Sequence, residues 1–125
     1  MTIGLDPHTG LDHWSIYEYW PETLQIDKDR YLPTAQIRQM MTNHGFTKCH
    51  SSIARHVNQS FPARNELEEG RLAENVTSQL GVLSDEQYRK GYQRLLQAVE
   101  LAESNGKELN IVSDLRLYGT IGWKA

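Results

Sequence analysis

The feature that most constrains the fold is a helix whose start, apolar face and end are all specified locally. Ser84-Asp85-Glu86-Gln87 has the pattern of a capping box, in which Ser84 accepts from the backbone of Gln87 and the Gln87 side chain reaches back. Asn105-Gly106 has the left-handed preference that ends helices. Between these signals, the apolar positions form one stripe at helical spacing: Tyr88, Tyr92, Leu95, Leu96, Val99 and Ala102. The sequence therefore predicts one long amphipathic helix.

A long extended segment follows this helix. From Leu109 to Trp123 the odd positions are mostly apolar and most even positions are polar or amphipathic, which is the period of a strand with one buried face. Gly119 and Gly122 indicate a bend or a close approach of another backbone. The pattern predicts either one long strand or a hairpin.

The first half of the chain predicts two further strands and a short helix. Thr2–Leu5 is short and apolar, and it runs into Asp6-Pro7-His8-Thr9-Gly10, whose Pro and Gly mark a loop. A short amphipathic helix is predicted between Pro33 and Gly45, and Phe46–Val57 has strand character. Because the first strand has no preceding turn or cap, the chain is expected to begin inside a fold.

The segment from Leu11 to Pro33 is rich in aromatic residues and has no clean period. A turn of helix around Trp14–Tyr19, with Pro21 as a break, is expected inside a long packed loop. Loops of this length are uncommon in compact domains unless they shape a site or a lid. The alternative is that the rings simply cover the core.

The strand Phe46–Val57 carries two histidines and the only cysteine. Strict alternation places two sets of side chains on opposite faces: Cys49, Ser51, Ile53 and Val57 on one, and His50, Ala54 and His56 on the other. About 20 Å of extended chain separates the two histidines, so they cannot bind one metal ion together. We expect both to be solvent-side residues, no metal site, and a buried or half-buried thiol at Cys49.

Composition excludes several classes of function. The 125 residues, 38% of them hydrophobic, fit a single domain over residues 1–125 with one core. A net charge of -3, with both signs interspersed, favours neither nucleic acid nor an anionic membrane as a partner. No apolar run approaches the roughly 20 residues of a membrane-spanning helix, and no signal segment is visible, so a cytoplasmic location is expected.

Four groups of residues carry a more specific signal. They are Ile3-Gly4-Leu5-Asp6-Pro7-His8, then Trp14-Ser15-Ile16-Tyr17-Glu18-Tyr19-Trp20, then Thr77-Ser78-Gln79-Leu80 before Leu83-Ser84-Asp85-Glu86, and finally Asp114-Leu115-Arg116-Leu117 with Gly122-Trp123. In their residues and in their order they resemble the carboxyl-terminal half of class I S-adenosylmethionine-dependent methyltransferases of the bacterial small-molecule type. The resemblance covers essentially the whole chain.

The resemblance implies an α/β fold, a partial Rossmann-like methyltransferase fold with about three strands and two main helices. The sheet would be mixed, with the last strand antiparallel between the first and the middle strand. S-adenosylmethionine is the cofactor of that family. The family's glycine-rich turn and its ribose-holding acidic residue have no counterpart here, so no cofactor-binding residue and no cofactor are expected for this chain alone.

The resemblance also places the acceptor pocket after the first strand, in keeping with the general rule for open α/β sheets. The residues of this segment that are candidates for substrate binding are Asp6, His8, Asp12, His13, Trp14 and Tyr17. Their acid and imidazole groups can orient an acceptor or remove a proton during methyl transfer, although no catalytic residue is singled out. The alternative is that Asp6 caps the turn and the histidines are solvated.

We therefore expect the chain to supply the acceptor-side half of a methyltransferase acting on a small molecule, as a fragment or as one piece of a split enzyme. Methyl transfer depends largely on alignment of donor and acceptor, so this half should be inactive alone. The alternative is a non-enzymatic interaction or small-molecule-binding module derived from the same fold. Hydrolase or nuclease activity has little support, because no nucleophile elbow, paired-carboxylate site or zinc-ligand spacing is present.

The apolar edge of the first strand predicts a protein partner. Exposed strand edges pair readily with other chains. The partner is expected to be either a second copy, joined near Ile3 by edge pairing or by exchange of segments, or a separate amino-terminal methyltransferase half.

Overall fold

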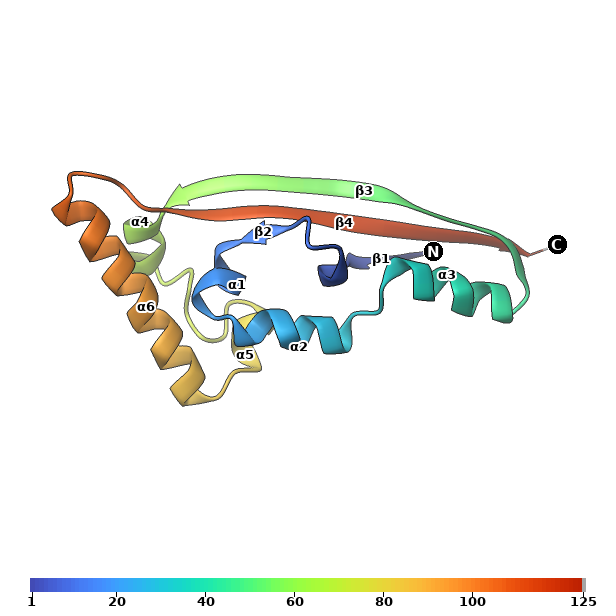
Figure 1. Cartoon of the computed structure of the whole chain (residues 1–125), viewed down its shortest axis with the longest axis horizontal. Helices are drawn as coiled ribbons and strands as arrows, with labels where there is room; N and C mark the ends of the chain where they lie inside the picture. Colours follow the sequence, from blue (N-terminus) through green and yellow to red (C-terminus); the bar gives the residue numbers. More distant parts are fainter. Residues whose placement is uncertain (125) are drawn as a thin grey trace.

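One long strand organises the whole sheet. The computed structural model describes residues 1–124, and its sheet has four strands: β1 (Thr2–Leu5), β2 (His13–Trp14), β3 (Phe46–Pro62) and β4 (Asn110–Lys124). β3 pairs with β4 along one side, whereas β1 and β2 pair with different parts of its other side, and every pairing is antiparallel. β4 thus lies between β1 and β3 as expected, and it is one continuous strand (Figure 1). The short β2 is a fourth strand that the sequence does not predict.

The helices at both ends of the molecule match the local signals. The 3-10 helix η1 (Pro7–Thr9) follows β1, and six α-helices follow in the order α1 (Ser15–Tyr19), α2 (Glu22–Arg30), α3 (Thr34–Asn43), α4 (Ala63–Glu68), α5 (Ser78–Gly81) and α6 (Asp85–Ser104). α6 begins with the predicted capping box, with Ser84 and Gln87 bonded reciprocally at 3.0 and 3.1 Å. After α3, Gly45 adopts the expected left-handed conformation with φ of 94°.

The turn of helix expected around Trp14–Tyr19 is present as α1, but the long loop expected around it is wrong, because Glu22–Arg30 forms a second helix, α2 (Figure 1). Pro21 begins this helix instead of breaking the chain: its φ of -61° is already helical, and proline is tolerated at a helix start. The buried side chains of α2 are Thr23 and Asp27, both polar. A helix that buries polar groups has no apolar stripe, which is the signal that sequence reasoning relies on.

A bulge in β3 overturns the predicted faces of that strand. Ile53 pairs with Tyr118 and Arg55 with Leu117, so Ala54 is an extra residue on the β3 side. After the bulge the alternation reverses. His50 pairs with Ile121 and His56 with Arg116, and these partners lie on opposite faces of β4. The two histidines therefore do not share a side, although both are exposed as expected; Cys49 is half-buried.

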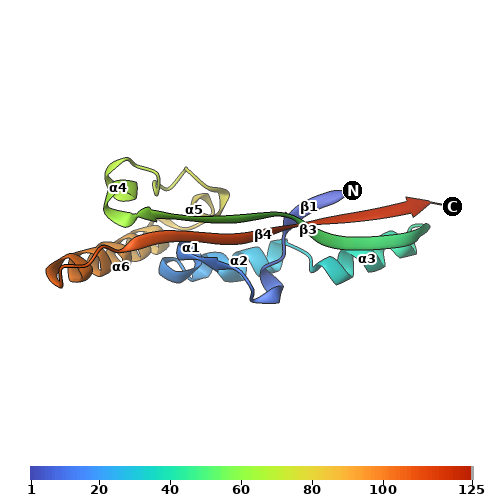
Figure 2. The ribbon, with the colours of Figure 1, turned by 90° about the horizontal axis from the view of Figure 1, so that it is seen from above.

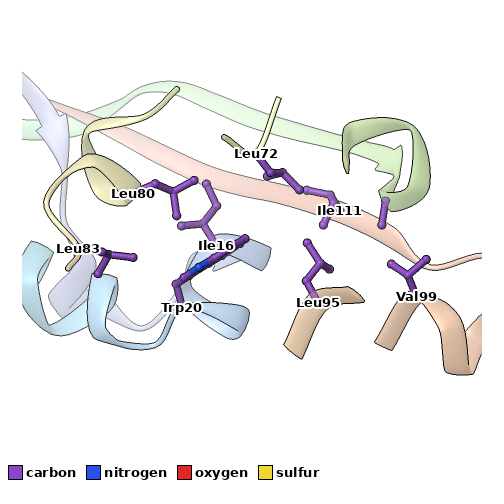
Figure 3. Close-up of a cluster of buried hydrophobic side chains, with 9 residues drawn as sticks. Ile16, Trp20, Leu72, Leu80, Leu83, Leu95, Val99 and Ile111 are labelled. Carbon is purple, nitrogen blue, oxygen red and sulfur yellow. The ribbon is translucent and has the colours of Figure 1, made fainter. Parts of the chain in front are cut away.

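The hydrophobic core lies at the α6 end of the sheet. Its buried members come from α1, α4, α5, α6 and β4 and from the segments beside them, and Figure 3 shows the cluster: Ile16, Trp20, Ala63, Leu72, Leu80, Leu83, Leu95, Val99 and Ile111. Trp20 has no exposed surface, its Nε1 donates to the Tyr88 carbonyl at 2.9 Å, and its ring stacks on that of Tyr88. One of the predicted loop aromatics is therefore the centre of the core.

The two sides of the sheet are covered differently. Figure 2 shows α1, α2 and α3 along one side of the strands, whereas α4 and α5 lie on the other side, near the α6 end. α3 packs against β3 and β4 at the end of the sheet opposite α6, near the residues of β4 that pair with β1. Within residues 1–124, no helix has the length and apolar character needed to cross a membrane.

Candidate functional site

A cavity of about 620 Å³ opens beside β2 and α1. It has the size of an ordinary small-molecule site. Four of the six candidate residues line it, namely Asp12, His13, Trp14 and Tyr17. The remaining walls come from the η1 segment, α1, α2 and the start of β4: Pro7, Gly10, Ser15, Glu18, Tyr19, Leu24, Lys28, Leu109, Asn110 and Val112. We refer to it as the β2 cavity.

The aromatic wall of the β2 cavity is held rigidly. The rings of Trp14 and Tyr17 meet edge to face, with centroids 5.0 Å apart. The Tyr17 hydroxyl donates to Asp27 Oδ2 at 2.6 Å. Burial, followed by this bond to the Asp27 carboxylate, raises the pKa of the Tyr17 phenol far above its usual value. Tyr17 is therefore a fixed, protonated wall residue and not a base.

Asp27 fixes Tyr17 because it is itself fully buried and well paired. Its carboxylate also accepts from Arg30 Nε at 3.0 Å and from Gln79 Nε2 at 3.2 Å. A buried carboxylate is tolerated only with such partners. The network joins α1, α2 and α5 beneath the cavity, and sequence reasoning missed it because Gln79 is distant in the chain.

At the other wall, Asp12 anchors the start of β2 to β4. Its Oδ1 accepts from the Arg116 backbone N–H at 3.0 Å and lies 3.3 Å from the Arg116 guanidinium. The same guanidinium donates to the Leu11 carbonyl at 2.7 Å. The Asp12 side chain is only 5% exposed and is paired with Arg116, so its role in the cavity wall is structural.

His13 is the one cavity imidazole, and it stands opposite a carboxylate. In the β2–β4 pairing it faces Asp114. Asp114 also bonds to His56 from β3 and lies 3.7 Å from Arg116. The bond from His56, assisted by the charges of Arg116 and of both histidines, holds the pKa of Asp114 below its usual range. Asp114 is thus an anion at neutral pH, and the exposed His13 is its neighbour across the β2–β4 pairing.

The sequence analysis does not predict that Asp114, Arg116 and His56 lie near His13, although the sequence contains one indication of it. Asp114 and Arg116 are even positions of the alternating segment, so they share a face of β4. The contribution of His56 depends on the bulge in β3, which only the pairing with β4 reveals. Within residues 1–124, no three His, Cys, Asp or Glu side chains are arranged to hold a metal ion.

Asp6 and His8, the two remaining candidates, lie outside the β2 cavity. Asp6 is 3% exposed, and its carboxylate accepts from the backbone N–H groups of His8 at 3.1 Å and Thr34 at 3.0 Å. It therefore caps η1 and also holds the start of α3, the structural alternative considered for this residue. His8 Nε2 lies 2.8 Å from the Tyr31 carbonyl on the surface.

The structure thus divides the candidate residues into a cavity group and a structural group. We compared the chain with models of protein families, with curated proteins and with solved structures. None of the three comparisons found a match.

Proposed function

We propose that this chain supplies the acceptor-binding half of an S-adenosylmethionine-dependent methyltransferase and binds a small-molecule acceptor in the β2 cavity. The observation that carries the proposal is the convergence of Asp12, His13, Trp14 and Tyr17 on one cavity of about 620 Å³. These residues were selected from the segment after the first strand alone. The position of β4, antiparallel between β1 and β3, is the arrangement that the resemblance implies and supports the same proposal.

The residues of this chain do not fit a site for the methyl donor. Such a site uses a glycine-rich turn between a strand and a helix, where backbone N–H groups approach the ligand closely. In residues 1–124, β1 is joined to η1 by Asp6 alone, and β2 and β3 lead directly into α1 and α4. None of these junctions contains a glycine. We therefore assign no step of methyl transfer to this chain by itself.

The chemistry left to this chain is binding and proton removal. Trp14 and Tyr17 offer two rings at a fixed angle for a planar acceptor. His13 is exposed at the cavity wall opposite the anionic Asp114, so it can take a proton from an acceptor hydroxyl or amine. Tyr17 cannot do so because its own proton is held by Asp27.

Titration followed by NMR tests the proposal. With phenol and indole as probes, we expect the Trp14 indole N–H resonance and the His13 ring resonances to shift, whereas those of buried Trp20 and distant Trp123 stay in place. Cyclohexanol, which has no aromatic face, is the matched control and should shift them less. S-adenosylmethionine added alone should shift nothing. Binding of the donor by this chain, or equal shifts at Trp123 and Trp14, would contradict the proposal.

A second candidate function is a non-enzymatic small-molecule-binding module that acts as a homodimer. The observation that favours it is the exposed edge of β1, where Ile3 is 58% exposed. The two functions differ when a chain with the glycine-rich turn is supplied. A methyltransferase half should gain S-adenosylmethionine binding in the mixture, whereas an independent module should not.

A further inference from the structure

The outer edges of β3 and β1 are protected very differently. The outer edge of β3 carries Lys48 and Arg55 and is interrupted by register shifts at Phe46/Lys48 and at Ile53/Arg55. Charges and bulges are the devices by which proteins prevent unwanted strand pairing. β1 has neither: Thr2–Leu5 contains no charged residue and no proline, and its pairing with β4 is regular. Within residues 1–124, no strand pairs with its outer edge.

Exposed apolar side chains surround the unprotected edge of β1. Met1 is 77% exposed and Ile3 is 58% exposed, and Leu32 and Met40 are exposed nearby. Next to the edge lies a largely apolar cavity of about 480 Å³, which we call the β1 cavity. It is lined by β1, by the segment between α2 and α3, by one face of α3 and by β4, and Ile37, Met41 and Phe46 are among its walls. Apolar surface beside a free strand edge is typical of a protein interface.

The walls of the β1 cavity carry almost no charge. Arg30 is the only permanently charged side chain among the residues that line the β1 cavity. Its guanidinium is already paired with Asp27 at 2.9 Å and donates to Ser78. The walls of the β1 cavity therefore add no unpaired permanent charge to an interface between two copies.

We propose that β1 pairs antiparallel with β1 of a second copy of this chain, across a two-fold axis near Ile3. Antiparallel pairing is self-complementary, since each residue of one strand exchanges the same backbone bonds with its counterpart. With the axis perpendicular to the sheet, the faces are preserved. Ile3, which pairs with Gly119, then packs beside its copy on one face. On the other face the two α3 helices approach each other, and Met40 helps to close the β1 cavities.

The interface is expected to be weak, because four-residue strands contribute few backbone bonds. We place it at the small end of protein interfaces, with a dissociation constant on the order of 10 µM. Sedimentation velocity from about 1 to about 200 µM spans this constant. The unmodified chain should change from monomer to dimer across that range.

Two matched substitutions locate the interface. Ile3→Lys places a charge on the β1 edge, and Ile53→Lys makes the same change on β3, at a side chain that is 52% exposed against 58% for Ile3. Because both side chains are largely exposed, both variants should keep the far-ultraviolet circular dichroism and the thermal midpoint of the parent. Ile3→Lys should weaken dimerisation at least about tenfold, by charge repulsion across the axis, whereas Ile53→Lys should leave it unchanged.

Hydrogen exchange provides a second readout that does not depend on a variant. Amides of Thr2–Leu5 should become more protected as the concentration rises, and amides of Phe46–Pro62 should not. A chain that stays monomeric over the whole range overturns the proposal and leaves the β1 edge to a different partner, such as a donor-binding half. Dissociation by Ile53→Lys but not by Ile3→Lys, or protection confined to β3, also overturns it. The NMR titration of the β2 cavity is independent of these outcomes.

Discussion

Replacing Gly91 with alanine tests the packing of the core directly. Gly91 lies in α6 and is buried against the Trp20 ring. A Cβ at this position would stand 2.0 Å from Trp20 Cδ1 and 2.2 Å from Nε1, distances that no pair of unbonded atoms adopts. Trp20 cannot retreat freely, since it has no exposed surface and its Nε1 is bonded to the Tyr88 carbonyl. The methyl group must therefore displace the indole or push α6 away.

Three terms set the size of the effect. Alanine has an intrinsic helix preference about 1 kcal/mol better than glycine, which favours the variant. Overpacking a filled core costs about 1–3 kcal/mol. Separating the buried indole N–H from its acceptor costs about 1–3 kcal/mol more. The net expectation is a loss of about 3 kcal/mol in the free energy of unfolding, or about 10 °C in Tm for a domain of this size.

Gly81→Ala is the matched control for Gly91→Ala. Gly81 is also helical but exposed, and a Cβ there would meet nothing closer than a carbonyl oxygen at 3.7 Å. This variant should be neutral or stabilised by up to about 1 kcal/mol. Urea and thermal unfolding, followed by circular dichroism, measure both. If Gly91→Ala were as stable as the parent chain, the reasoning about Trp20 would be refuted. Adding Trp20→Leu to Gly91→Ala should reduce the extra cost of the alanine.

Three further variants test the polar groups around the β2 cavity. Asp27→Asn leaves Arg30 without its anion in a buried network and should cost about 3 kcal/mol in urea unfolding. Tyr17→Phe keeps the ring but removes the donor to Asp27, so it should cost about 1–2 kcal/mol while the Trp14 shifts with phenol persist. The folded-state pKa of Asp114 is depressed, so its stabilising effect is present above its ordinary pKa of 3.8 and disappears as the pH falls through the lower folded value. Asp114→Asn should therefore lower Tm at neutral pH, and the difference from the parent should vanish in strong acid; a constant difference at all pH values would contradict this assignment.

Local sequence signals predict much of the fold, and they miss the features that depend on buried polar side chains or on strand pairing. The boundaries of α6 follow from its own capping residues, those of α3 follow from Pro33 and Gly45, and the alternation in Asn110–Lys124 predicts β4. α2 escaped prediction because Thr23 and Asp27, the side chains it buries, are polar. The faces of β3 were wrong because a bulge depends on the partner strand and leaves no trace in a period-2 pattern.

The candidate site also contains residues that the sequence predicts and residues that only the strand pairing adds. Asp12, His13, Trp14 and Tyr17 are close in sequence, and a resemblance confined to one segment was enough to select them. Asp114, Arg116 and His56 join them only because β4 pairs with β2 on one side and β3 on the other. Asp6 has the same residue type and segment as Asp12, yet its carboxylate is used to cap η1 and α3. Which acid faces the cavity is decided by backbone hydrogen bonds that the sequence does not specify.

The central position of β4 has a consequence for how the chain is made. β1, β2 and β3 pair with β4 and not with one another, and β4 follows all of them in the sequence. During synthesis no strand pair can form until Asn110–Lys124 has left the ribosome, so the sheet must assemble in one late step through contacts between distant residues. Such contacts form slowly, and unpaired strands are prone to aggregation while they wait.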